Sequence, residues 1–210
     1  MANIASASAT LYPRPALKLR DAAEGLGSLP RGTITEILGE RSTGRTALAQ
    51  TMLATATLGG EVAAWIDGCD SFDPASAVRA GADLGKLLWV QCAHRLETAL
   101  KAADMVLHSG GFGLVILDLC DIPATALGRV PLSYWYRIRN AVQHTPAIVL
   151  VLAKEAVAKA SSAHQLAMSQ SSIEWRGLAP FQTIVRMESE AVTRKPYDAV
   201  PLKLAALAEA

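Results

Sequence analysis

Short apolar runs alternate along this chain with stretches in which apolar residues recur at helical spacing. The runs are short and nearly continuous, so they predict buried strands, at Thr33–Leu38, Val62–Asp67, Leu87–Gln91, Leu114–Leu119 and Ala147–Leu152. Helical spacing predicts helices at Thr46–Leu58, Leu96–Leu107 and Ser133–Gln143. Strands that alternate with helices indicate an α/β fold, with a mostly parallel sheet flanked by helices on both faces.

The two ends of the chain differ from this central pattern. Ser171–Arg176 and Phe181–Ser189 alternate with period two around a turn at Gly177–Pro180, which predicts a C-terminal antiparallel hairpin that extends the sheet. Small polar residues dominate the start of the chain. We therefore expect a flexible N-terminal arm over 1–20, a core domain over 21–190 and a tail over 191–210, with 201–210 either a short helix or a frayed end.

Composition limits the classes of function. Hydrophobic residues make up 51% of the chain, charged residues 19%, and the formal net charge is +1, so the totals show no strong attraction to DNA or to anionic membranes. The apolar run within 113–119 is far shorter than the roughly 20 residues that cross a bilayer, and no secretion signal is evident. The three cysteines lack zinc or disulfide spacing and indicate reduced thiols in a cytoplasmic protein.

The segment from Gly39 to Thr46 matches the phosphate-binding pattern G-x-x-x-x-G-K-[ST], except that Arg45 replaces the lysine. It lies between a predicted strand and a predicted helix, where backbone N–H groups and the helix dipole favour phosphate. Because a guanidinium is broader than an ammonium group, two alternatives stay open: a loop that binds ATP or ADP, and a loop kept only for packing. The expected nucleotide-binding residues are Gly39, Ser42, Thr43, Gly44, Arg45, Thr46 and Asp118, with Thr46 and Asp118 as Mg²⁺ ligands if nucleotide binds.

Two further segments carry a family resemblance. The stretch 27–39 is similar to the lead into the phosphate loop of the RecA family, and 65–74 resembles the second-strand motif of that family. The resemblance covers roughly 26–186 and implies a RecA-like P-loop NTPase core. It also implies that Cys69 stands where the family has the glutamate that activates water, and that Lys154 stands at about the position of its γ-phosphate-sensing glutamine. We therefore expect a pseudo-ATPase with no catalytic residues and no required cofactor.

Among RecA-like proteins the chain most resembles the ImuA family, which works in SOS-induced translesion synthesis. This implies an accessory protein that binds an ImuB-like Y-family polymerase homologue, with RecA and an error-prone replicative-type polymerase as further expected partners. One alternative is a weak or oligomer-dependent DNA-repair ATPase that uses Lys154 or a group from a neighbouring subunit. The other is a SulA-like inhibitor of cell division, against which the surviving phosphate loop argues.

A predicted helix offers a candidate partner surface. Tyr136, Arg137 and Arg139 combine an aromatic ring with two cations, a composition enriched at interfaces, whereas Trp135 and Ile138 are expected in the core. The two loops that would contact DNA supply only Arg129 and Lys159 as cations, so weak or no DNA binding is expected.

Overall fold

The computed structural model describes residues 17–18, 28–176, 183–195 and 202–207. Eight strands form one sheet in the order β10-β9-β8-β3-β7-β6-β4-β5, and β1 and β2 form a separate two-stranded ladder. The strands are β1 (Leu17–Lys18), β2 (Ser28–Leu29), β3 (Thr33–Leu38), β4 (Val62–Asp67), β5 (Leu87–Gln91), β6 (Phe112–Asp118), β7 (Ile148–Ala153), β8 (His164–Arg176), β9 (Thr183–Lys195) and β10 (Leu202–Leu207). The six strands from β8 to β5 in this order pair in parallel, and β9 and β10 add antiparallel pairings. The predicted α/β architecture with a C-terminal antiparallel hairpin is confirmed.

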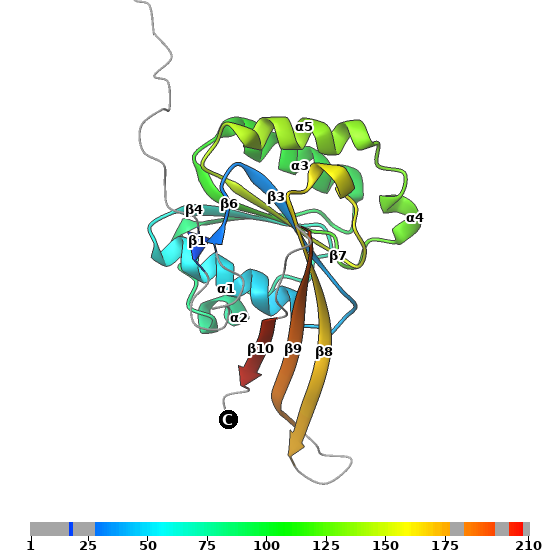
Figure 1. Ribbon diagram of the computed structural model, residues 1–210. Coiled ribbons are helices and arrows are strands. Elements are labelled where there is room, and N and C mark those ends of the chain that lie inside the picture. Colours follow the sequence, from blue (N-terminus) through cyan, green and yellow to red (C-terminus); the bar gives the residue numbers. More distant parts are fainter. Residues whose placement is uncertain (1–16, 19–27, 177–182, 196–201, 208–210) are drawn as a thin grey trace, which may run out of the picture.

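Helices cover both faces of the parallel part of the sheet. Figure 1 shows α3 and α5 above it and α1 and α2 below it. The helices are α1 (Arg45–Leu58), α2 (Pro74–Arg79), α3 (Leu96–Ser109), α4 (Ala124–Leu127) and α5 (Leu132–Gln143), with 3₁₀ turns η1 (Leu84–Lys86) and η2 (Lys159–Ser161). Each face has its own apolar cluster, built around Trp65 and Met52 below and around Trp135 and Ile66 above. The two layers hold the carboxyl ends of β3, β4, β6 and β7 at one edge.

Three predictions about individual segments need correction. The run Leu87–Gln91 is not fully buried, because β5 is the outermost strand, and Leu88 is 42% exposed. Residues 202–207 do not form the short helix considered from the sequence: they form β10, which pairs antiparallel with β9, and β9 supplies the backbone partners that a lone segment lacks. Within the expected flexible arm, Leu17 and Lys18 pair with β2, while the other residues of 1–20 and the turn at 177–180 lie outside the described residues.

Candidate functional site

The connection between β3 and α1 has the backbone shape of an anion-binding loop. Ser42 has a φ of 60° and Gly44 a φ of 85°, so the chain reverses sharply just before α1 begins at Arg45. The Thr43 hydroxyl donates to the Glu40 carbonyl at 2.8 Å and braces the turn. Within the described part of the chain no side chain caps α1, so the N–H groups of its first turn are available to a ligand.

Close packing against the C-terminal hairpin fixes this loop. A Cβ atom at Gly39 would lie 2.5 Å from the Met168 carbonyl oxygen in β8, and φ at Gly39 is 155°. A Cβ atom at Gly44 would lie 3.0 Å from the Ser189 hydroxyl in β9. Both positions therefore require glycine, and β8 and β9 hold the loop in its turned conformation.

The loop borders a cavity of about 330 Å³. Five of the predicted nucleotide-binding residues line it, namely Ser42, Thr43, Gly44, Arg45 and Thr46. Gly39 lies behind the loop against Met168, and Asp118 lies behind Ser71, which itself lines the cavity. The cavity is large enough for phosphate groups, and the glycines, the uncapped helix and the Thr46 hydroxyl fit a phosphate ligand.

Asp118 lies at the carboxyl end of β6 with no exposed surface. Its carboxylate accepts hydrogen bonds from the Ser71 hydroxyl at 3.2 Å and from the Cys120 backbone N–H at 3.0 Å. Burial raises the pKa of Asp118, and the nearby Asp67 carboxylate raises this pKa further, while the hydrogen bonds from Cys120 and Ser71 act against these effects. A divalent cation would favour the charged form, so Asp118 fits the expected role of holding Mg²⁺ from behind Ser71.

The carboxyl end of β4 presents a thiol where the family resemblance implies a glutamate. Cys69 is 3% exposed; its thiol donates to the Asp118 carbonyl at 3.7 Å and its sulfur accepts the Asp121 N–H at 3.1 Å. Burial, followed by the charge of Asp118, raises the pKa of Cys69 to about 12. The thiol is therefore neutral at physiological pH and is turned into the protein.

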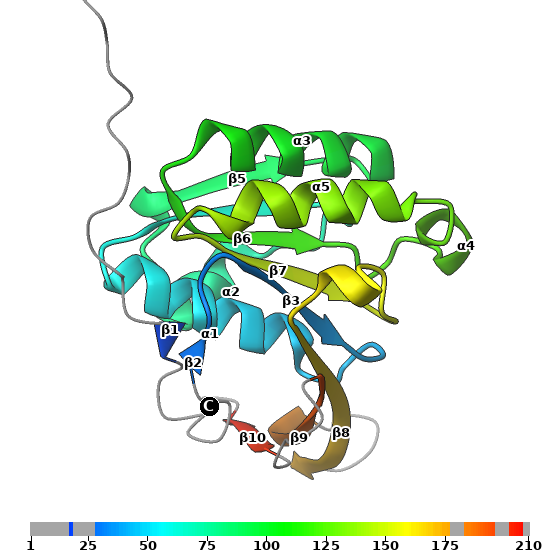
Figure 2. The ribbon, with the colours of Figure 1, turned by 45° about the horizontal axis from the view of Figure 1, so that its top comes forward.

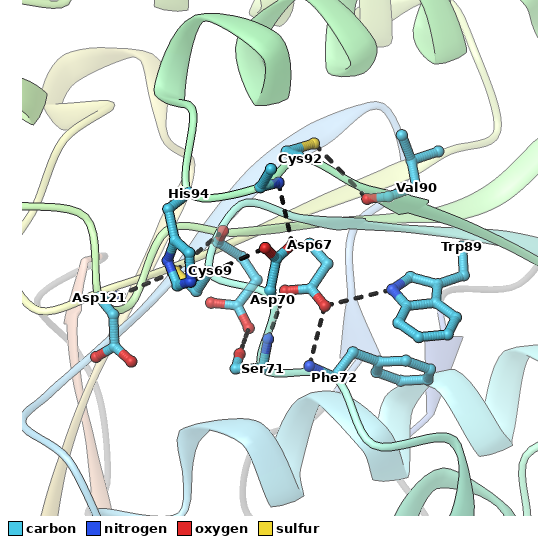
Figure 3. A network of polar contacts seen from close by, with 12 residues as sticks. Asp67, Cys69, Asp70, Ser71, Phe72, Trp89, Val90, Cys92, His94 and Asp121 are labelled. Atoms are coloured by element: carbon cyan, nitrogen blue, oxygen red, sulfur yellow. Dashed lines mark hydrogen bonds and ion pairs between the residues drawn. The ribbon is translucent and has the colours of Figure 1, made fainter.

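Two aspartates beside Cys69 hold the same segment in place (Figure 3). The Asp67 carboxylate accepts the N–H groups of Ser71 and Phe72 at 3.0 Å each and the Trp89 indole N–H at 3.3 Å. The Asp70 carboxylate accepts the N–H of Ala93 at 3.1 Å, and so ties the β4 end to the segment after β5. Both carboxylates therefore hold the segment that follows β4 through hydrogen bonds from backbone N–H groups.

Arg45, which replaces the lysine of the loop pattern, lies at a buried position where part of its guanidinium has no hydrogen-bond partner among the described residues. It is 6% exposed, and the atom without a partner among these residues is its Nη1. It lines the cavity at the loop and also a second cavity, and both include Cys120. Burial and then Asp118 raise the pKa of Cys120, whereas the charge of Arg45 lowers it, as expected if the guanidinium lies near this thiol. A buried, unpaired guanidinium N–H indicates a place for an acceptor.

Three features of the site were not predicted from the sequence. Ser71 stands between Asp118 and the cavity; the Lys154 ammonium lies 2.7 Å from a Glu40 carboxylate oxygen; and the Arg41 guanidinium lies 3.0 Å from Asp121. Each pair joins segments far apart in the sequence. The signal in the sequence was a polar residue within four positions of the end of each of β3, β4, β6 and β7, because parallel strands bring these positions together.

The candidate partner surface on α5 is separate from the loop. Tyr136 is 57% exposed and Arg139 is exposed, while Trp135 and Ile138 are buried as predicted. Arg137 lies 3.1 Å from Asp104 of α3 and 5.3 Å from the Tyr134 ring centre, so part of its bonding capacity is used within the protein. Over the described residues, no cluster of three metal-binding side chains occurs, and none of the helices could span a bilayer.

Comparisons with known proteins agree with this architecture. The family model described as the RecA N-terminal domain matches residues 8–127, more than half of the chain. Over 98 residues, 47% of this chain, it is 43% identical to Protein RecA of Clavibacter michiganensis subsp. michiganensis, 42% identical to Protein RecA of Bifidobacterium breve and 40% identical to Protein RecA of Thermus aquaticus. The matched part covers 27%, 25% and 28% of those three proteins, respectively.

Proposed function

Because the chain belongs to the RecA family, we propose that it is a RecA-like accessory domain that binds the phosphates of ATP or ADP with Mg²⁺ and acts through partner proteins, without turning nucleotide over as an ATPase does. The observation that carries this proposal is the state of Cys69: buried, hydrogen-bonded to the backbone and neutral. A general base must reach the attacking water and be unprotonated near neutral pH, and this thiol meets neither condition.

The neighbouring carboxylates do not replace it. Asp67 and Asp70 accept backbone N–H groups, and Asp118 is shielded by Ser71. Glu40 and Asp121 lie in ion pairs with Lys154 and Arg41, respectively. Each of these five acids thus has a partner that holds it, which supports phosphate binding without fast hydrolysis.

Isothermal titration with ATP and Mg²⁺, together with a steady-state phosphate-release assay, tests the nucleotide part. We expect saturable binding and no sustained release. The Arg45→Lys variant restores the lysine of the loop pattern and should bind ATP more tightly because an ammonium group fits the cradle better, yet it should not gain turnover, since Cys69 is unchanged. Repeated turnover by the natural chain, or by Arg45→Lys, would contradict the proposal.

The finer proposal concerns pathway and partners. Resemblance to the ImuA family supports a role in SOS-induced translesion synthesis beside an ImuB-like polymerase homologue, and beside RecA and an error-prone polymerase. The exposed Tyr136 and Arg139 support α5 as one contact surface. Affinity purification from DNA-damaged cells tests this. An ImuB-like protein recovered with the natural chain and lost with Tyr136→Ala supports it, whereas a cytoskeletal GTPase of cell division points to the SulA-like alternative.

One observation favours a slow ATPase as a second candidate. Lys154 forms an ion pair with Glu40 of the phosphate loop at 2.7 Å, so its cation lies beside this loop, and a cation at such a place can stabilise the charge of a transferred phosphoryl group. If a neighbouring copy completes such a site, phosphate release per molecule should rise with protein concentration. A rate that stays flat and near background over a wide concentration range excludes this candidate.

A further inference from the structure

A second cavity lies beside the phosphate loop, at the carboxyl ends of β3, β6 and β7. It measures about 560 Å³, within the usual range for ligand sites. Its walls come from the loop after β3, from the segment around α4 and from the connection between β7 and β8. Figure 2 shows α4 and the η2 turn of that connection at the same end of the sheet.

A buried carboxylate holds one wall of this cavity in place. Glu36 of β3 has no exposed surface, and its Oε1 accepts the backbone N–H groups of Val157 and Ala158 at 2.7 Å each. Its Oε2 accepts the Ser162 hydroxyl and the Gln165 side-chain amide, each at 2.8 Å. All four donors come from the β7–β8 connection or the start of β8, so this wall is preformed and a ligand need not order it.

The cavity combines apolar surface with charge. Ile122, Leu127, Val130, Leu132 and Val157 line it, and Leu132 is 62% exposed at the start of α5. Four of the ionisable residues that line it neutralise each other, as Lys154 with Glu40 and Arg41 with Asp121. Of the other ionisable residues in the lining, the cations Arg45 and Lys159 have no anionic partner among the described residues, and Glu155 is the one remaining acid. The unpaired charge in the cavity is therefore positive, and Arg45 carries it at a buried position.

We propose that this cavity binds a short segment of a partner protein in which an aspartate or glutamate is flanked by apolar residues, with the carboxylate paired to Arg45. A carboxylate matches the planar guanidinium, and apolar neighbours match the aliphatic walls. A nucleotide leaves these walls uncovered, and its phosphates have their own backbone site at the loop. A nucleic acid strand needs several cations, and this cavity offers two unpaired ones. The inference rests on the partner-binding role proposed above and names the chemistry of one partner.

Selection from a random twelve-residue peptide library displayed on phage, with the full 210-residue chain as target, tests this inference. Selected peptides should be enriched in an acidic residue next to Leu, Ile, Phe or Trp. Synthetic copies should shift the methyl NMR signals of Ile122 and Val157, and replacing their acid with the amide should weaken binding about tenfold.

Two variants and one control make the result specific. Arg45→Gln should weaken the synthetic peptide about tenfold, because it removes the charged donor. Leu132→Asp places a negative charge at the cavity mouth and should weaken it too, while an aspartate at the first position of α5 is compatible with the helix. Arg79→Gln, on α2 and away from both cavities, should bind like the natural chain.

Peptides without acidic enrichment, methyl shifts elsewhere, or equal binding to the natural chain and both variants would overturn the inference. Methyl shifts at Ile122 and Val157 produced by ATP with Mg²⁺, but not by any selected peptide, would also overturn it and assign Arg45 to nucleotide. The proposed lack of turnover is measured separately, so either proposal can fail while the other stands.

Discussion

The phosphate loop and the end of β4 lie at the same edge of the sheet but differ in what they are made of. The loop acts through backbone: an uncapped helix start, two glycines against β8 and β9, and positive φ at Ser42 and Gly44. The end of β4 acts through one side chain, and there a neutral thiol is hydrogen-bonded to the backbone of the β6 segment. We therefore expect phosphate binding at a site made of backbone to survive a change such as Arg45, whereas general-base chemistry depends on a single functional group.

The two regions also depend differently on their surroundings. Gly39 and Gly44 are fixed by the hairpin, while Asp67 and Asp70 hold the β4 end by accepting backbone N–H groups. Substitutions in one region should therefore change the shape of the phosphate loop, and substitutions in the other should change only the stability of the segment after β4.

Replacing Gly39 with alanine should disrupt the loop most. The new Cβ would lie 2.5 Å from the Met168 carbonyl oxygen, so backbone must move. We expect a loss of about 3 kcal/mol in the free energy of unfolding, measured by urea denaturation, together with loss of ATP binding. Gly60→Ala is the matched control: its φ is also positive, at 85°, but nothing lies within 4 Å of the added atom, so it should cost about 1 kcal/mol. Equal losses would mean that β8 does not shape the loop.

Replacing Asp67 with alanine should affect the end of β4 and leave the phosphate loop unchanged. Three N–H donors, from Ser71, Phe72 and Trp89, lose their acceptor. The expected cost is about 2 kcal/mol in urea denaturation, with ATP affinity unchanged in titrations at low temperature, where the variant stays folded. Asp73→Ala is a control for loss of an acidic helix cap in an exposed position, and should cost about 1 kcal/mol. A large fall in ATP affinity with Asp67→Ala would mean that the two regions are coupled.

Much of the fold was predictable because five of the six parallel strands, β3 to β7, are nearly continuous apolar runs. Strand β3 coincides with its predicted range, and β6 and β7 differ from theirs by one or two residues at each end. The strand at 202–207 was not predictable, because its pairing depends on β9 and its own sequence does not alternate between polar and apolar residues. The exposure of Leu88 depends on the place of β5 at the edge of the sheet, which local pattern does not encode.

The candidate site divides in the same way. The spacing of the phosphate-loop pattern identified Ser42 to Thr46, and in the structure these residues line a cavity. The roles of Ser71 and Lys154 depend on contacts between distant segments. The pairing of Glu36 could have been predicted, because a charged residue inside an otherwise apolar strand must be paired. In the structure, four donors surround it.

Replacing Asp118 with asparagine should stabilise the protein while weakening its use of Mg²⁺. Burial holds the pKa of Asp118 above that of an unfolded aspartate, so the charged form costs stability at neutral pH. The variant should gain about 1 kcal/mol at pH 7, and this advantage should shrink as pH falls toward 4, because the natural carboxyl then takes up its proton. Titrations with and without EDTA should show that Mg²⁺ strengthens ATP binding by the natural chain only. A variant that loses stability at pH 7, or keeps its response to Mg²⁺, would contradict this assignment.

The smallest expected effect concerns the alkaline stability that depends on Cys69. The pKa of Cys69 is about 12 in the folded protein, whereas an unfolded thiol ionises near pH 9. Between these two pH values, only the unfolded chain loses this proton. Stability should therefore fall as pH rises from 9 toward 12, with a share from Cys69 of less than about 1 kcal/mol between pH 8 and pH 9.5. Urea titrations of Cys69→Ser at both pH values should show a correspondingly shallower fall. Identical slopes for the two proteins would mean that the thiol is not held protonated.

The comparison between an intact backbone cradle and a neutral thiol is tested most directly by a single-turnover experiment. Protein in excess is mixed with ATP labelled in its γ-phosphate, with Mg²⁺, and bound ATP and free phosphate are followed over time. The account predicts that label is bound at once and that free phosphate rises no faster than in a matched sample without protein. Rapid conversion of the bound ATP to ADP and phosphate would show that a water-activating group is present, and would contradict the account.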